Sequence, residues 1–162
     1  MGKQNNIYYR ARMKAAEYND GLRSMESAAD LLGISYSTLS SYELGTVKCP
    51  QTDKILLMAD LYNAPELLNH FCTQECPIGN CGEVAKLEVA ELDRLVVKTL
   101  SKLRRAPQIK EDLLEITEDG EITPDEESIL EELLNDLDEI SAAAQELKLW
   151  ARRRMRREYR ND

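Results

Sequence analysis

Hydroxyl side chains dominate the segment from residue 35 to residue 46 of this 162-residue chain. Serine, threonine and tyrosine hydroxyls donate and accept hydrogen bonds, and they suit phosphate oxygens and base edges. The chain has a single histidine, His70, and we find no nucleophile elbow, phosphate-binding loop or triad of metal ligands. We therefore expect recognition through hydrogen bonds and not an enzyme.

Two short helices joined by a tight turn are predicted to position these hydroxyls. Ser24 can cap the first helix, and Gly33 follows it where the backbone must turn left-handed. Ser35 can cap the second helix, in which Leu39 and Tyr42 point inward. The apolar residues of the first helix are Met25, Ala28, Ala29, Leu31 and Leu32, and the outward residues of the second are Tyr36, Ser37, Thr38, Ser40 and Ser41.

This segment resembles the helix-turn-helix domain of the Cro and phage-repressor family. The resemblance covers about residues 5–68 and implies a compact five-helix domain that places its third helix in the major groove and binds DNA as a dimer. The residues that carry it are Ala29, Gly33, Leu39, Tyr42, the run Glu43-Leu44-Gly45, and Pro50 opening a helix with Ile55, Leu56, Met58, Ala59 and Leu61.

The resemblance also implies roles for single residues. Ser35 would contact phosphate, residues 46–48 would lie along the DNA backbone, and Met25 stands where the family usually has glutamine. Bases would face Tyr36, Ser37 and Ser41. The candidate DNA-binding residues are Ser24, Met25, Ser35, Tyr36, Ser37, Thr38, Ser40, Ser41, Thr46 and Lys48.

The charge of the chain gives DNA binding little support, because the formal net charge is −9. Residues 1–81 hold seven Lys or Arg against nine Asp or Glu. A few basic residues lie close to the two predicted helices in sequence. Lys3, Arg10, Arg12 and Lys14 precede the helix that Ser24 caps, and Lys48 follows the helix that Ser35 caps. We therefore expect modest affinity per monomer, which dimerisation would raise.

Helical apolar spacings along most of the chain predict an all-α fold, with only residues 7–9 briefly β-like. We expect a helix-turn-helix DNA-binding domain over 1–68, a cysteine-containing linker over 69–82, and a helical hairpin or coiled-coil dimerisation domain over 83–162. No apolar run is long enough for a membrane span, and the first 14 residues lack the apolar centre of a signal peptide. These features favour a cytoplasmic protein.

The expected linker contains three cysteines, Cys72, Cys76 and Cys81. Thiolates bind zinc and iron–sulfur clusters, but this spacing departs from the common patterns of both. We favour cysteines that pack as small apolar residues, and we expect no cofactor. A redox- or metal-sensing regulator that uses these thiols is the alternative.

Amphipathic helices fill the remainder. We expect a helix from Glu83 that Pro107 ends, a short helix that ends at Gly120, and a last helix that Thr123 caps with Glu126. The last helix carries a heptad stripe, which either packs on the preceding helices or pairs with a second subunit. The candidate dimerisation residues are Leu130, Leu133, Leu137, Ile140, Ala144, Leu147 and Trp150.

Charge is segregated along the last helices. Residues 111–146 contain fifteen acids and no Lys or Arg, whereas residues 148–160 contain seven bases and one acid. This pattern suits the helix macrodipole, and it also allows pairing between subunits, DNA contact, or a protein partner for the acidic half.

Together these patterns predict a sequence-specific DNA-binding transcriptional regulator. We expect a homodimeric repressor, of the kind found in phages and mobile elements, that occludes a palindromic operator in double-stranded DNA. An antitoxin-like protein-interaction module is a further alternative.

Overall fold

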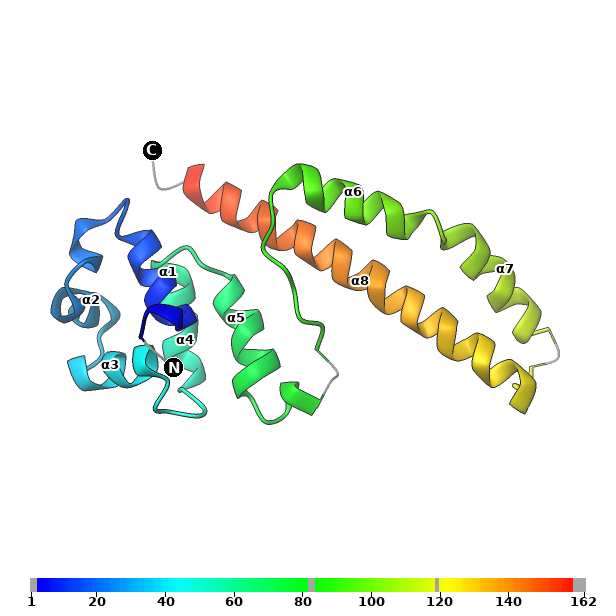
Figure 1. Ribbon diagram of the computed structural model, residues 1–162, viewed down its shortest axis with the longest axis horizontal. Helices are drawn as coiled ribbons and strands as arrows, with labels where there is room; N and C mark the ends of the chain where they lie inside the picture. The colour runs from blue at the N-terminus through cyan, green and yellow to red at the C-terminus, as the bar shows by residue number, and fades with distance from the viewer. Residues whose placement is uncertain (1–2, 82–83, 119, 159–162) are drawn as a thin grey trace. The chain divides into compact units, whose positions relative to one another are not determined.

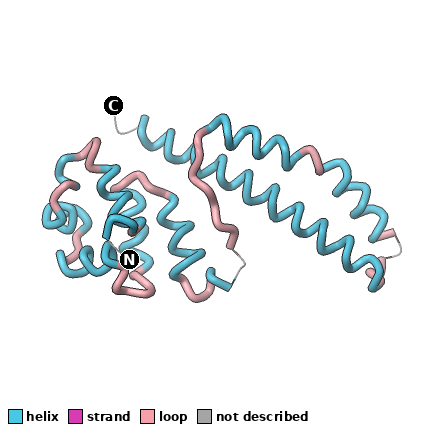
Figure 2. The backbone as a smooth tube through the Cα atoms, in the orientation of Figure 1, coloured by secondary structure: helices cyan, strands magenta, loops and turns pink. Residues whose placement is uncertain are grey.

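A computed structural model describes residues 3–81, 84–118 and 120–158, apart from the side chains of Lys3, Asn80 and residues 156–158 (Figure 1). These residues form helices and loops without a strand, which confirms the predicted all-α class (Figure 2). None of the described helices combines the length and the apolar character needed to cross a bilayer. The chain divides into two compact units, unit 1 with residues 1–86 and 152–162, and unit 2 with residues 87–151.

Unit 1 contains the predicted five-helix domain, in which short helical turns join the main helices. The helices are α1 (Ile7–Ala15), α2 (Met25–Leu32), α3 (Tyr36–Leu44), α4 (Thr52–Leu61) and α5 (Glu66–His70), and the short turns are η1 (Lys3–Asn5), η2 (Asp20–Leu22), η3 (Phe71–Glu75) and η4 (Gly79–Cys81). The β-like interpretation of residues 7–9 is wrong. They begin α1, because the Asn6 side chain caps the helix by accepting from the Tyr8 amide at 2.8 Å.

Local capping sets the ends of α2 and α3 as predicted. Ser24 and Ser35 are the N-caps, and the Ser35 hydroxyl accepts from the Thr38 amide at 3.1 Å. Gly33 adopts the left-handed conformation at φ 64° and ends α2. Pro50, in contrast, does not open α4, since the helix begins at Thr52 and Pro50 lies buried before it.

The core of unit 1 joins all five helices and the turn before α2. Its largest fully buried side chains are Tyr8, Leu22, Leu39, Ile55, Met58 and Leu67. Two leucines predicted on apolar faces, Leu31 and Leu56, are exposed. Leu31 precedes the buried Leu32, and Leu56 follows the buried Ile55. A short helix turns only one narrow face toward the core, so the adjacent leucine points to solvent.

Unit 2 contains α6 (Leu92–Leu103), α7 (Ala106–Ile116) and most of α8 (Pro124–Glu158). The expected helix from Glu83 is wrong in its start: residue 83 lies outside the described residues, and residues 84–91 are not helical. Pro107 does not end a helix but lies in the first turn of α7, where its missing N–H breaks no bond. Glu126 closes the predicted capping box by accepting from the Thr123 amide at 2.8 Å.

The inward face of α8 matches the heptad stripe at first and then turns away from it. Leu133 is buried with Ile109 and Ile116, and Leu130 and Ile140 pack beside them. Leu137 and Ala144 are exposed, whereas Ala143, Glu146 and Leu149 are buried; Leu147 and Trp150 are half-buried.

The face turns because α8 packs on two helices in succession, first α7 and then α6 (Figure 1). Three ion pairs mark the second contact as antiparallel: Arg105 with Asp136, Lys102 with Glu139, and Lys98 with Glu146. Much of the stripe therefore packs on α7 and α6 of the same chain. This is one of the two arrangements that the heptad pattern allows.

Candidate nucleic-acid interface

Three hydroxyls meet at the N-terminus of α3. The Ser35 Oγ atom lies 2.9 Å from Ser37 Oγ and 2.8 Å from Thr38 Oγ1, in addition to accepting from the Thr38 amide. Tyr36, between them, is 53% exposed. A helix N-terminus surrounded by hydroxyls offers donors to phosphate oxygens and to base edges.

The hydroxyls farther along the chain hold α3 and its following loop in shape. Ser41 donates to the Thr38 carbonyl at 2.8 Å, and Thr46 donates to the Ser41 carbonyl at 3.1 Å. Ser40 is half-buried and Lys48 is exposed. Of the predicted residues on α3, Tyr36 and Ser37 are thus the most exposed, whereas the donor hydrogen of Ser41 is already used.

The two candidates at the start of α2 differ in their surroundings. The exposed Ser24 hydroxyl caps α2 at 3.5 Å from the Ser27 amide. Met25 is half-buried against the core of unit 1. Its thioether has no N–H donor, so it lacks the polar contact of the glutamine usual in the family.

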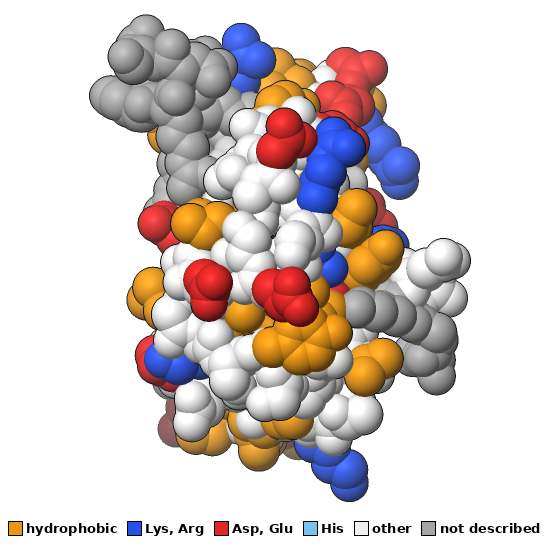
Figure 3. All heavy atoms as spheres, turned by 90° about the vertical axis from the view of Figure 1, so that its left-hand side faces the viewer, with side chains coloured by type: hydrophobic (Ala, Val, Ile, Leu, Met, Phe, Trp, Pro, Cys, Tyr) orange, Lys and Arg blue, Asp and Glu red, His pale blue; other side chains and the backbone are white. Residues whose placement is uncertain are grey.

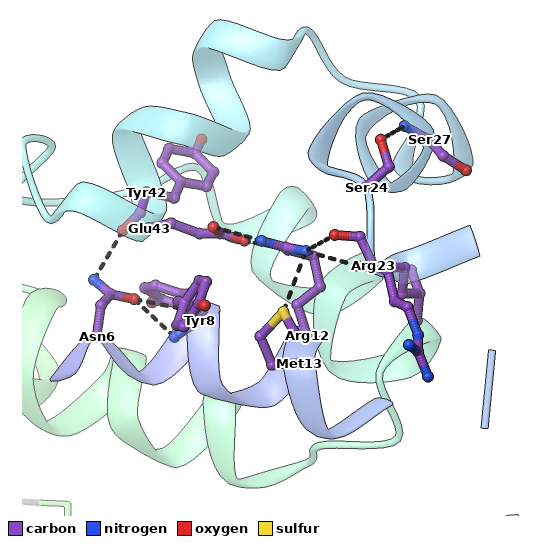
Figure 4. Close-up of polar contacts among 11 residues, drawn as sticks. Asn6, Tyr8, Arg12, Met13, Arg23, Ser24, Ser27, Tyr42 and Glu43 are labelled. Atoms are coloured by element: carbon purple, nitrogen blue, oxygen red, sulfur yellow. Dashed lines mark hydrogen bonds and ion pairs between the residues drawn. The ribbon is translucent and has the colours of Figure 1, made fainter. Parts of the chain in front are cut away.

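A buried ion pair fixes α3 to α1 (Figure 4). Arg12 Nε lies 2.5 Å from Glu43 Oε1, Arg12 Nη2 lies 3.0 Å from Glu43 Oε2, and the two side chains are 3% and 0% exposed. Arg12 Nη1 also donates to the Leu22 carbonyl at 2.7 Å and to the Arg23 carbonyl at 3.2 Å. The hydrogen bonds to Glu43 raise the pKa of Arg12 above its usual value.

This geometry corrects one interpretation of the sequence. Arg12 belongs to the interior and not to a basic cluster near DNA, because its guanidinium is occupied on three sides. The basic residues left on the surface of α1 are Arg10 and Lys14. Only tertiary structure reveals the difference, since the partner Glu43 is 31 positions away.

Acidic and basic side chains are scattered among hydrophobic and neutral polar ones on the face that Figure 3 shows. Sequence reasoning missed one cation close to α2, Arg23, which is exposed and lies 3.0 Å from Asp20. Its position directly before the cap Ser24 is the signal that makes it a candidate for phosphate contact. The candidate interface therefore presents hydroxyls and helix N-termini more than a basic patch.

Comparison with known proteins finds one similarity, which covers the part of unit 1 that contains α2 and α3. Residues 21–68 match the helix-turn-helix family, and this range runs from the η2 turn through α2, α3 and α4 into α5. This segment is therefore similar to helix-turn-helix domains, in agreement with the resemblance that the sequence carries, and this similarity supports DNA binding and a role in transcription regulation. The match covers well under half of the chain. No curated protein and no solved structure matches the chain.

The cysteine segment packs beside the DNA-binding domain. Cys72 and Cys76 are half-buried against the core of unit 1, and Cys81 donates to the Pro77 carbonyl at 3.3 Å. Across the described residues, no three His, Cys, Asp or Glu side chains gather as metal ligands. His70 lies edge-on to the ring of Tyr8 and 3.6 Å from a Glu75 oxygen, so it contributes to packing.

Proposed function

We propose that the chain is a sequence-specific repressor that binds double-stranded DNA as a homodimer and occludes an operator. The observation that carries the proposal is the exposed N-terminal end of α3, rich in hydroxyls and fixed to α1 by the buried Arg12–Glu43 pair. A rigid helix that presents short polar side chains suits the major groove, where base edges have distinct donor and acceptor patterns.

The proposed contacts divide between bases and phosphates. Tyr36, Ser37 and Ser40 would read bases, with Ser41 as an acceptor. Phosphates would lie against the N-termini of α2 and α3, at Ser24 and Ser35, and against exposed side chains of the flanking loops. The exposed flanking residues are Arg23, Thr46 and Lys48, and the half-buried Met25 and Thr38 lie in the first turns of α2 and α3. Few of these are cations, so the proposal predicts weak binding per monomer and a shallow salt dependence.

Dimerisation would remedy that weakness, and unit 2 provides a surface for it. Residues at positions i, i+4, i+8 and i+11 of α6 form an exposed apolar row, which we call the α6 row: Leu92, Val96, Leu100 and Leu103. Leu100 is 59% exposed. In addition, Leu134 and Leu137 are exposed on α8.

We propose a second copy of the chain as the occupant of the α6 row. Unit 2 buries few large apolar side chains, chiefly Leu95, Ile109, Ile116, Leu133 and Leu149, which is a small core for a folded unit. A two-fold pair of helical hairpins would extend that core into a helical bundle. The dimer would then hold two α3 helices about 34 Å apart, one turn of DNA.

Selection of bound fragments from a genomic DNA library by the full chain tests the reading of α3. We expect enrichment of a palindromic motif. The double variant Ser37→Glu/Ser41→Glu should lose it while the protein remains folded, because carboxylates would face phosphate. The matched control, Ser101→Glu/Ser128→Glu, adds the same charge to exposed positions of unit 2 and should bind normally. Normal binding by the α3 variant would contradict the assignment.

Sedimentation of the full chain at tens of micromolar tests the dimer. Val96→Glu/Leu100→Glu should convert a dimer into a monomer, whereas Ser101→Glu, on the other side of α6, should not. A monomeric parent chain would refute the interface and leave DNA itself to bring two copies together.

A further inference from the structure

Unit 1 contains a cavity of about 360 Å³ that the DNA-binding surface does not use. Its walls come from α1, the η2 turn, the end of α4 and the start of α5, together with Arg153, and none of its lining residues belongs to α2 or α3. The volume falls in the range of small-molecule sites, about 300–1,000 Å³. Its apolar lining residues include Ala11, Ala15 and Leu22.

Three oxygen atoms among the lining residues are buried without a hydrogen-bond partner in the described part of the chain. They are Tyr62 Oη, Asn63 Oδ1 and Glu66 Oε2, and Tyr62 is only 4% exposed. Buried polar groups in native proteins almost always have partners, because an unpaired one costs about 1–3 kcal/mol. Asn63 Oδ1 and Glu66 Oε2 can only accept, whereas the Tyr62 hydroxyl can accept or donate. A group with several N–H donors therefore suits all three oxygens.

The backbone holds these acceptors in place. Asn63 has a left-handed backbone at φ 49°, and its side-chain amide donates to the Arg153 carbonyl at 3.3 Å. One hydrogen of the Asn63 amide nitrogen is therefore used, and the amide oxygen has no partner among the described residues.

The charges around the cavity have both signs. Glu66 Oε1 lies 3.7 Å from Arg153 Nη1, longer than a hydrogen bond, and Lys14 is an exposed cation of the lining. One carboxylate with free acceptor capacity thus shares the cavity with two cations. A simple cation would meet repulsion from Lys14 and Arg153, and a simple anion would meet repulsion from Glu66.

We propose that this cavity binds a small aliphatic zwitterion, an amino acid or a dipeptide. Its ammonium group has three N–H donors, which would serve Glu66 Oε2, Asn63 Oδ1 and Tyr62 Oη. Its carboxylate faces Lys14 and Arg153, and its side chain packs on Ala11, Ala15 and Leu22. This arrangement satisfies the unpaired oxygens and both signs of charge at once.

The ligand would also lie close to the Arg12–Glu43 pair that fixes α3 to α1. Burial, and next the negative charge of Glu43, raise the pKa of the Tyr62 phenol above its usual range, which places Tyr62 in the field of the Arg12–Glu43 pair. A ligand at Tyr62 is therefore expected to alter how firmly α3 is held, and with it operator affinity. This link rests on the proposed function, whereas ligand binding itself does not.

Calorimetry and thermal unfolding of the full chain with aliphatic L-amino acids and their dipeptides test the site. At least one compound should bind and raise the melting temperature. For leucine, the matched probes are 4-methylpentanoate, without the ammonium, and 3-methylbutylamine, without the carboxylate. Each should bind about tenfold or more weakly than the zwitterion. Binding by none of the zwitterions would overturn the proposal and assign the three oxygens to ordered water.

Variants separate a binding role from a structural one. Glu66→Gln should weaken binding about tenfold or more. Tyr62→Phe should also weaken it while leaving the ligand-free melting temperature unchanged or higher, because it removes an unpaired hydroxyl. Glu17→Gln, exposed and outside the lining, is the control. Full binding by both cavity variants would overturn the site, and operator affinity unaffected by a bound ligand would overturn only the link to DNA.

Discussion

Replacement of Arg12 by methionine should destabilise unit 1 by about 3–5 kcal/mol. Methionine keeps much of the aliphatic volume but removes every donor that the guanidinium supplies. Glu43, which is 0% exposed, would lose both of its bonds to Arg12, at 2.5 and 3.0 Å. The carbonyls of Leu22 and Arg23 would lose a donor as well, which costs about 1 kcal/mol each.

A double-mutant cycle isolates the pair. Glu43→Met removes the buried carboxylate, so in the double variant Arg12→Met/Glu43→Met no charge is left without a partner. The double variant should therefore be more stable than the sum of the single losses predicts, by about 2 kcal/mol. Arg10→Met, at an exposed position of the same helix, is the control and should change stability by less than about 0.5 kcal/mol.

Urea unfolding of the full chain can follow the two units separately. All the tyrosines among the described residues belong to unit 1, and the single tryptophan, Trp150, belongs to unit 2. Tyrosine ring resonances in NMR spectra then report the loss in unit 1, while tryptophan fluorescence should keep its midpoint. A loss below about 1 kcal/mol for Arg12→Met, or additive effects in the cycle, would refute the view that this pair anchors α3.

Three further substitutions probe other parts of the fold by urea unfolding. Leu39→Asp places a charge at a fully buried position and should abolish the folding of unit 1; an unchanged midpoint would mean that the faces of α3 are reversed. Gly33→Ala should cost about 1 kcal/mol through its backbone alone, since φ is 64° and no atom lies within 4 Å of the added Cβ; a neutral result would contradict the left-handed cap. Glu146→Gln should cost unit 2 about 1.5–3 kcal/mol, because this buried carboxylate lies 2.8 Å from Lys98 Nζ, whereas Glu139→Gln at the surface should cost less than about 1 kcal/mol; equal effects would show that burial is immaterial.

The sequence by itself determined the helix caps and the tight turn of this protein. The caps at Ser24 and Ser35, the left-handed Gly33 and the capping box between Thr123 and Glu126 all lie where the pattern predicted. Each depends on contacts between residues at most a few positions apart, and such contacts can be read from spacing and residue type. The helix-turn-helix, which is built from them, was therefore predictable, and so was the hydroxyl-rich face of α3.

Tertiary structure alone decided which of several plausible faces is buried. It placed Arg12 inside against Glu43, left Leu31 on the surface, and turned the inward stripe of α8 from Leu133 toward Leu149. It also brought residues from α1, α4 and α5 together with Arg153 around the cavity. In each case the deciding contact joins residues far apart in the chain, and an amphipathic pattern shows that a face seeks a partner without showing which partner the fold supplies.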